Sequence, residues 1–160
     1  MKTTRESARE ASHKRLVHIL SDLLEKNYDA EKGYKKAIEH THNPDLKKFL
    51  KNQAVQRNHF ATEIDRKLHQ LNEHPKDNNN GSALGNIHRF WMDFKSSWGK
   101  KDDHSILEEC LRGEKASLKE YKEKLKEKNL NPEIKTMLEN HRDSIEKTLK
   151  QISLLEDLED

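Results

Sequence analysis

The scarcity of helix breakers, in a sequence whose apolar residues recur every three or four positions, constrains this chain most. Only 5 glycines and 3 prolines occur in 160 residues, so the chain has few places to turn. Charged residues make up 38% of it and hydrophobic residues only 31%, so the hydrophobic core must be narrow. Long helices that each bury one apolar stripe fit this composition, whereas a β-sandwich or a doubly wound sheet would need more Val, Ile and Gly.

Turn signals divide the chain into four stretches with helical periodicity. The pairs Asn43-Pro44 and Asn131-Pro132 each supply an N-cap and a residue suited to the first helical turn, and Asp103 is the expected cap of the third helix. These signals predict four long helices. The predicted helices cover residues 12–41, 44–73, 103–128 and 131–158.

The connections between these helices predict how they pack. Short connections after the first and third helices require antiparallel hairpins, whereas residues 74–102 join the second helix to the third. A connection of that length must carry the chain along the bundle, so we predict an all-α, ferritin-like antiparallel four-helix bundle with a long crossover. This single domain covers residues 12–160, and residues 1–11, which lack an apolar stripe, are predicted to form a flexible N-terminal tail.

The crossover contains aromatic residues at helical spacing in the stretch SALGNIHRFWMDFKSSWG. We expect a short extra helix here that packs across the bundle, because buried aromatic rings dominate core energetics. The alternative is a helix that binds a membrane surface or a partner. Any rings that the bundle leaves uncovered would be buried by a homodimer, whose predicted contacts are Trp91, Phe94 and Trp98.

Each predicted apolar stripe is interrupted near its middle by polar residues. In an antiparallel bundle of similar helices, these positions lie near mid-height and should meet in one layer. A buried polar group without a partner costs about 1–3 kcal/mol, so the layer must be internally paired or must hold an ion. The predicted polar layer consists of Asn27, Glu31, Gln53, Gln56, Arg57, Glu114 and His141.

Two arrangements would satisfy this layer. In the first, Arg57 neutralises Glu31 or Glu114, and the remaining amides and the imidazole complete a hydrogen-bond network. In the second, the layer holds iron or another divalent metal, as carboxylates and Glu-x-x-His motifs do in ferritin-like bundles. The second helix offers only a Gln-x-x-His and the fourth has no Glu-x-x-His, so the network without a cofactor is favoured. The alternative metal ligands are Glu31, His59, Glu114 and His141.

Four motifs in chain order, YDAEKGY, QRNHF, HRFWMDFK and ILEECLRGE, resemble a bacterial ferritin-like four-helix-bundle domain of unknown function. The resemblance covers about residues 16–128 and implies a cytoplasmic protein associated with stress. The first motif is also similar to a related stress-protein family whose glutamate binds metal, which implies a ligand role for Glu31. Leu111 stands where the family tends to have Glu, and Leu149 where its fourth helix often has His. Both differences weaken a metal site.

The remaining signals bear on function by exclusion. The sequence contains no glycine-rich phosphate loop, nucleophile elbow or paired-cysteine site. Charges of both signs interleave with a formal net charge of +2, which indicates a solvated surface and no nucleic-acid partner. No apolar run approaches the ~20 residues of a transmembrane helix. We therefore expect a non-catalytic, cytoplasmic bundle protein with a stress-related role. The alternative is an iron-binding or ferroxidase-type protein with a degenerate site, so whether the chain is an enzyme stays open.

Overall fold

The computed structural model describes residues 1–73 and 102–159, which form an all-α bundle. The helices follow in the order α1 (Thr4–Ile38), α2 (Pro44–Gln70), α4 (Asp103–Lys124) and α5 (Pro132–Glu159). The predicted four-helix fold is confirmed. The predicted crossover helix and its dimer contacts, Trp91, Phe94 and Trp98, lie outside the described residues. In the described ranges, no helix is both long and apolar enough to cross a membrane.

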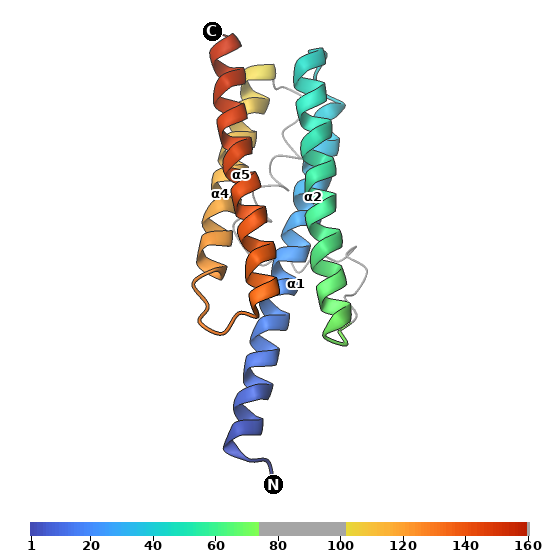
Figure 1. The fold of residues 1–160 in the computed structure, drawn as a ribbon. Helices are drawn as coiled ribbons and strands as arrows, with labels where there is room; N and C mark the ends of the chain where they lie inside the picture. The colour runs from blue at the N-terminus through green and yellow to red at the C-terminus, as the bar shows by residue number, and fades with distance from the viewer. Residues whose placement is uncertain (74–101, 160) are drawn as a thin grey trace.

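Two antiparallel hairpins make up the bundle. α1 packs mainly against α2, and α4 packs mainly against α5. α2 and α4 run in the same direction, so α2 ends and α4 begins at opposite ends of the bundle (Figure 1). This is the topology that the short and long connections predict.

The Asn-Pro signals act as the sequence indicates. Asn43 Oδ1 accepts hydrogen bonds from the backbone nitrogens of Asp45 and Leu46 at 2.9 and 3.1 Å. Asn131 Oδ1 accepts one from the backbone nitrogen of Glu133 at 2.9 Å. In both cases the next residue is a proline that begins the helix, where its missing N–H is not needed.

Two predicted helix starts were wrong. α4 is capped by Asp102, whose Oδ1 accepts from the backbone nitrogen of Ser105 at 2.8 Å, so Asp103 is the first helical residue and not the cap. α1 begins at Thr4 and not at residue 12, because the Thr3 side chain and the side chain at position 6 form a reciprocal capping box. The flexibility of residues 1–11 stays a prediction.

Three of the helices also end earlier in the sequence than predicted. α1, α2 and α4 end at Ile38, Gln70 and Lys124, before the expected ends at 41, 73 and 128. Figure 1 shows the first turns of α1 extending past the other helices at one end of the bundle. The side chains of residues 4–15 are exposed there, so the bundle proper starts within α1.

The buried apolar side chains form two clusters along the bundle. One includes Leu50 and Ile106 and lies toward the α1–α2 turn, and the other includes Leu20 and Ile64 and lies toward the α4–α5 connection. Each helix places a buried polar residue between its contributions to the two clusters. These residues are Asn27, Arg57, Glu114 and Thr148.

Candidate functional site

Arg57 of α2 and Glu114 of α4 form an ion pair inside the bundle. Arg57 Nη2 donates to Glu114 Oε2 at 2.9 Å, and the two side chains are 2% and 0% exposed. Burial alone would lower the pKa of Arg57, but the charge and hydrogen bond of Glu114, together with the nearby Tyr34 and Tyr121, outweigh it and raise that pKa above its ordinary value. The guanidinium therefore stays charged in the interior, and its partner is a carboxylate.

Tyr34 of α1 completes the coordination of that carboxylate. Its hydroxyl donates to Glu114 Oε1, the oxygen that Arg57 does not use. Burial and the charge of Glu114 raise the pKa of Tyr34 well above its ordinary value, so the hydroxyl keeps its proton and acts as a donor. Both oxygens of Glu114 are thus bound by donors from neighbouring helices.

Asn27 of α1 links the ion pair to the rest of the layer. Arg57 Nη1 donates to Asn27 Oδ1 at 2.9 Å. Asn27 Nδ2 donates to the backbone carbonyl of Leu23 at 2.8 Å and to the hydroxyl oxygen of Tyr121 at 2.9 Å. A guanidinium only donates and a carbonyl only accepts, so the orientation of the amide is fixed.

The same reasoning fixes the proton on His141. Since the Tyr121 oxygen accepts from Asn27, its own proton points to His141 Nδ1, 3.0 Å away. The proton of the neutral imidazole is then on Nε2, which lies 3.2 Å from Glu63 Oε1. The hydrogen bonds therefore run in one direction from Arg57 to Glu63, and they pass through α2, α1, α4, α5 and back to α2.

The surroundings of His141 keep the imidazole neutral. Its ring stacks on Phe60 with 4.0 Å between ring centroids. Burial lowers the pKa of His141 to about 4, although its hydrogen bond to Glu63 acts in the opposite direction. A second proton on Nδ1 would also face the Tyr121 hydroxyl and disturb its hydrogen bond. The network is thus built for the neutral form.

Gln53 and Gln56 belong to a separate polar cluster. Thr148 Oγ1 donates to Gln53 Oε1 at 2.9 Å, and Gln56 Nε2 lies 3.5 Å from the same hydroxyl. This cluster joins α2 to α5, and in the described part of the chain no hydrogen bond connects it to Arg57. The predicted single layer is therefore divided into two groups.

Glu31 is not the partner of Arg57. Its carboxylate accepts from Asn58 Nδ2 at 3.2 and 3.1 Å, and Oε1 lies 2.8 Å from Nζ of Lys35, a side chain that is 65% exposed. These contacts place Glu31 at the edge of the bundle. Of the two carboxylates that the sequence left open, Arg57 pairs with Glu114.

The alternative metal ligands do not form one donor set. His59 is 71% exposed, with its Nε2 3.2 Å from Glu63 Oε1. Glu31 binds Asn58 and Lys35, both oxygens of Glu114 are bound, and Nε2 of His141 carries a proton. Within residues 1–73 and 102–159, no three His, Cys, Asp or Glu side chains come together as ligands for a metal ion. These residues do not fit a ferritin-like metal centre.

Sequence reasoning missed several members of the network. Tyr34 and Tyr121 were identifiable as inner-face residues, and a buried tyrosine hydroxyl normally needs a hydrogen-bond partner, so this signal was available. Glu63 gave no such signal, because its side chain is 35% exposed and lies at the border of the buried region. Thr148 gave none either, since a threonine within a helix does not show which neighbour its hydroxyl meets.

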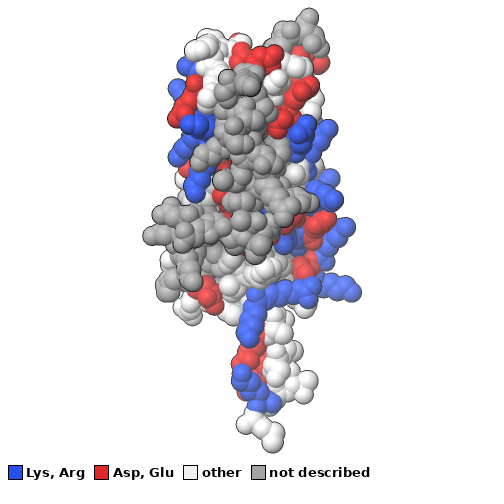
Figure 2. Space-filling view, turned by 180° about the vertical axis from the view of Figure 1, so that it is seen from behind, with Lys and Arg blue, Asp and Glu red and all other residues white. Residues whose placement is uncertain are grey.

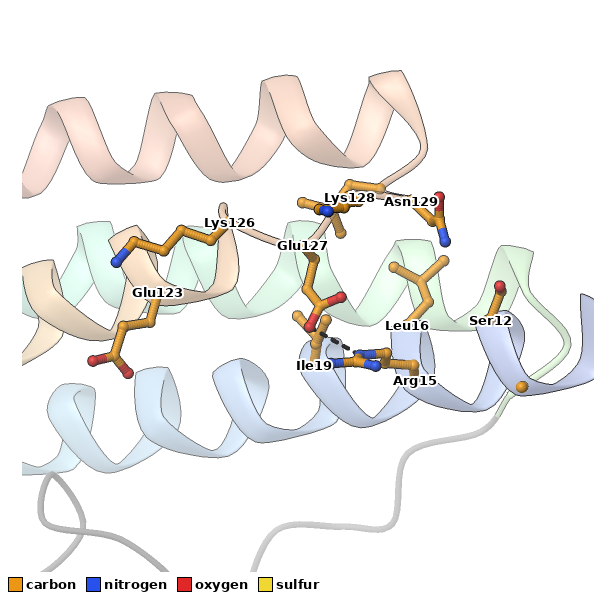
Figure 3. Close-up of a pocket in the computed structure, with 11 residues that line it drawn as sticks. Ser12, Arg15, Leu16, Ile19, Glu123, Lys126, Glu127, Lys128 and Asn129 are labelled. Atoms are coloured by element: carbon orange, nitrogen blue, oxygen red, sulfur yellow. Dashed lines mark hydrogen bonds and ion pairs between the residues drawn. The ribbon is translucent and has the colours of Figure 1, made fainter. Parts of the chain in front are cut away.

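A hollow outside this layer lies where α1 extends from the bundle (Figure 3). It has a volume of about 440 Å³ and lies between residues 11–19 of α1 and the α4–α5 connection. Arg15 Nε donates to Glu127 Oε1 at 2.9 Å and ties the two walls together. No member of the Arg57 network lines this hollow.

The topology and the buried layer define the chain as a ferritin-like helical bundle. The model of a family described as a domain of unknown function, DUF2383, matches residues 15–128, and the chain belongs to this family. This match confirms the resemblance that the sequence motifs carry. No curated protein sequence matches the chain significantly.

Solved structures with the same fold support this assignment. A variant of Dps1 from Mycobacterium smegmatis has a TM-score of 0.74 at 12% identity, covering 90% of this chain and 96% of that one. The bacterioferritin-related protein of Bacteroides fragilis, described as a dodecameric thioferritin, has a TM-score of 0.58 at 16% identity, covering 91% and 90%. At these identities the likeness shows the fold alone.

Proposed function

We propose that this chain is a non-catalytic, cytoplasmic helical-bundle protein with a stress-related role, whose central layer is held by a charged hydrogen-bond network. The observation that carries the proposal is the position of the Arg57 guanidinium, bound to Glu114 and Asn27 at the middle of the bundle. A guanidinium with these partners supplies the positive charge that a metal ion would supply in such a layer.

The burial of the network supports a structural role. Arg57 is 1% exposed and Glu114 is 0% exposed, so a substrate cannot touch either group in the folded protein. Every hydrogen bond from Arg57 to Glu63 joins a different pair of helices. A network of this kind fixes how the helices are rotated about their axes, because a rotated helix would leave a charge or an amide without a partner.

The stress-related and cytoplasmic parts of the proposal have a different basis. They rest on the resemblance of the motifs to the ferritin-like family, and Dps1 and thioferritin are the named proteins with a similar fold. The name thioferritin makes iron the ion to test first.

Elemental analysis and an aerobic ferrous titration test the proposal. We expect no stoichiometric metal in the purified chain and no oxidation of ferrous ion above the buffer rate. Glu114→Gln is the matched variant, because it removes the carboxylate on which any mid-bundle metal would depend. Stoichiometric iron with turnover in the wild type, lost in Glu114→Gln, would overturn the proposal in favour of a ferroxidase.

A further inference from the structure

α4 carries a row of lysines on its outward face. Lys115, Lys119 and Lys122 follow helical spacing, so their side chains share one side of α4, and Lys126 lies in the turn just after the helix. All four are exposed. Lys122 lies 3.9 Å from Glu146, whereas the other three form no ion pair within the described residues. A hollow of about 350 Å³ runs along this row and is called the lysine groove here. It is lined by Lys115, Leu118, Lys119, Lys122, Glu123 and Lys126.

The end of α5 carries the opposite charge and an exposed apolar side chain. Leu154 is 64% exposed, which is unusual for a large apolar side chain in the described part of this chain. Glu156 and Asp157 follow it, and neither pairs with a lysine or arginine among the described residues. Residues 153–157, called the α5 tip, contain no basic residue. Asp157 is three residues after the exposed Leu154 and shares its side of α5, whereas the half-buried Glu156 lies on another side of the helix.

The lysine groove complements the α5 tip in charge and in apolar character. Its lining combines one apolar residue, Leu118, with four lysines and a single glutamate, so a docked leucine could be flanked by acid–base pairs. Figure 2 shows basic side chains along the right-hand edge of the bundle and acidic ones at the upper right. α4 and α5 lie on that side in this view.

The tip cannot reach the groove of its own molecule. α4 and α5 are antiparallel, so the end of α5 lies beside the first turns of α4 (Figure 1), and Ile152 packs in the same cluster as Ile106. The lysine groove is in the second half of α4. From residue 106 to residue 119 the helix rises roughly 20 Å at 1.5 Å per residue. The occupant must come from another molecule.

We propose that the α5 tip of one molecule docks into the lysine groove of a second copy. Leu154 packs on Leu118, Asp157 on the same side of α5 faces the groove lysines, and Glu156 adds negative charge at the tip. The two surfaces are different patches on one chain, so the contact is heterologous and repeats head to tail, giving a ring where the rotation closes. The contact uses none of the residues of the aromatic dimer contact that the sequence predicts, and it goes beyond the proposed function.

Sedimentation velocity with light scattering on the full chain tests the proposal. We expect association that grows with protein concentration and weakens at high salt, because exposed charges are screened. Two charge reversals probe the two faces: Glu156→Lys with Asp157→Lys at the tip, and Lys119→Glu with Lys122→Glu in the groove. Each reversal should weaken association roughly tenfold or more, since like charges then face each other.

Mixing the two reversed proteins gives the sharpest result. The unaltered acidic tip of one variant meets the unaltered basic groove of the other, and the two altered faces are also complementary. An equimolar mixture should therefore associate although each variant alone does not. The proposal is overturned by a wild type that stays monomeric at all concentrations, or by a mixture that associates no better than its components.

Two controls distinguish docking at these two surfaces from general effects of net charge and of surface hydrophobicity. Lys48→Glu with Lys51→Glu changes the net charge as the groove reversal does, at exposed positions of α2, and should leave association unchanged. Val55, which is 70% exposed on α2, is the control for Leu154. Leu154→Ser should weaken association and Val55→Ser should not; equal effects in either comparison would contradict the assigned surfaces. All altered residues are exposed or half-buried, and circular dichroism checks that each variant is folded.

Discussion

Arg57 and Glu114 join two helices that are not main packing partners. α2 packs chiefly on α1 and α5, yet Arg57 Nη2 reaches Glu114 Oε2 of α4 at 2.9 Å. The ion pair therefore crosses the centre of the bundle, where it is sealed between the two apolar clusters. This position makes the pair a direct link between the two hairpins, and the first predictions concern the network around it.

Asn27→Asp should disturb the whole network although the side chain keeps its size. A carboxylate at this position still accepts from Arg57, but it cannot donate to the Leu23 carbonyl or to the Tyr121 hydroxyl. The hydroxyl proton would turn to the new carboxylate, and His141 would lose the donor at Nδ1. We expect a loss of about 1–3 kcal/mol in urea unfolding at neutral pH.

The same variant should also raise the pKa of His141 above about 4, since a negative charge is added beside it. The midpoint of its ring resonances in an NMR titration measures this shift. Asn52→Asp, at an exposed position of α2, adds the same charge outside the network and is the control. Equal behaviour of the two variants would contradict the assigned direction of the hydrogen bonds.

The pKa of His141 predicts a pH dependence of stability. It is lowered from 6.5 in the unfolded chain to about 4 in the folded protein, so the unfolded state binds the proton first as the pH falls. The stabilisation is complete above pH 6.5 and is lost progressively down to about pH 4. From the size of the shift, the loss amounts to about 3 kcal/mol.

His141→Gln is the variant that isolates this contribution. Other groups also titrate in the acid range, so the quantity to measure is the difference in unfolding free energy between wild type and variant at each pH. That difference should shrink between pH 6.5 and pH 4. A constant difference across this range would show that the histidine takes up its proton in both states alike.

Lys26 of α1 holds α1 to α4 outside the central network. Its Nζ lies 2.8 Å from Asp22 Oδ2 and 2.5 Å from Glu120 Oε1, and its side chain is 13% exposed. Burial favours neutral forms, but the hydrogen bonds and charges of the cluster outweigh it, so the pKa of Asp22 is lowered and that of Lys26 is raised.

Lys26→Met should therefore lower the free energy of unfolding by about 1–3 kcal/mol at neutral pH. Asp22 contributes stability that is present above pH 3.8 and lost below it, while Lys26 contributes stability that is lost only at pH values above 10.5. Lys14→Met, at an exposed position of α1, is the control. Indistinguishable urea midpoints for the two variants would contradict a role for this cluster.

Periodicity and turn residues predicted the fold because the apolar stripes, the Asn-Pro starts and the long crossover all agree. The apolar stripe does not reach the start of α1, so periodicity does not predict it, although Thr3 and Glu6 have the spacing of a capping box. A helix that begins before its buried face shows that local capping and tertiary burial are separate requirements.

The candidate site was predicted in part. Arg57 stood out because a charge in the middle of an apolar stripe needs a partner, and the layer it implies is present in the fold. Periodicity gives the side of a helix on which a residue lies, but not how far that helix is rotated against its neighbours. The choice of Glu114 over Glu31, and the path through Tyr121 to His141, depend on that rotation.

The free energy of unfolding of the metal-free Arg57→Ala protein at neutral pH tests the central claim most directly. Removing the guanidinium leaves Glu114 charged and buried, so the account predicts a loss of about 3–5 kcal/mol relative to the wild type. Part of that loss should be recovered in the double variant Arg57→Ala with Glu114→Gln, which has no charge to bury. Equal unfolding free energies for the wild type and Arg57→Ala would contradict the account.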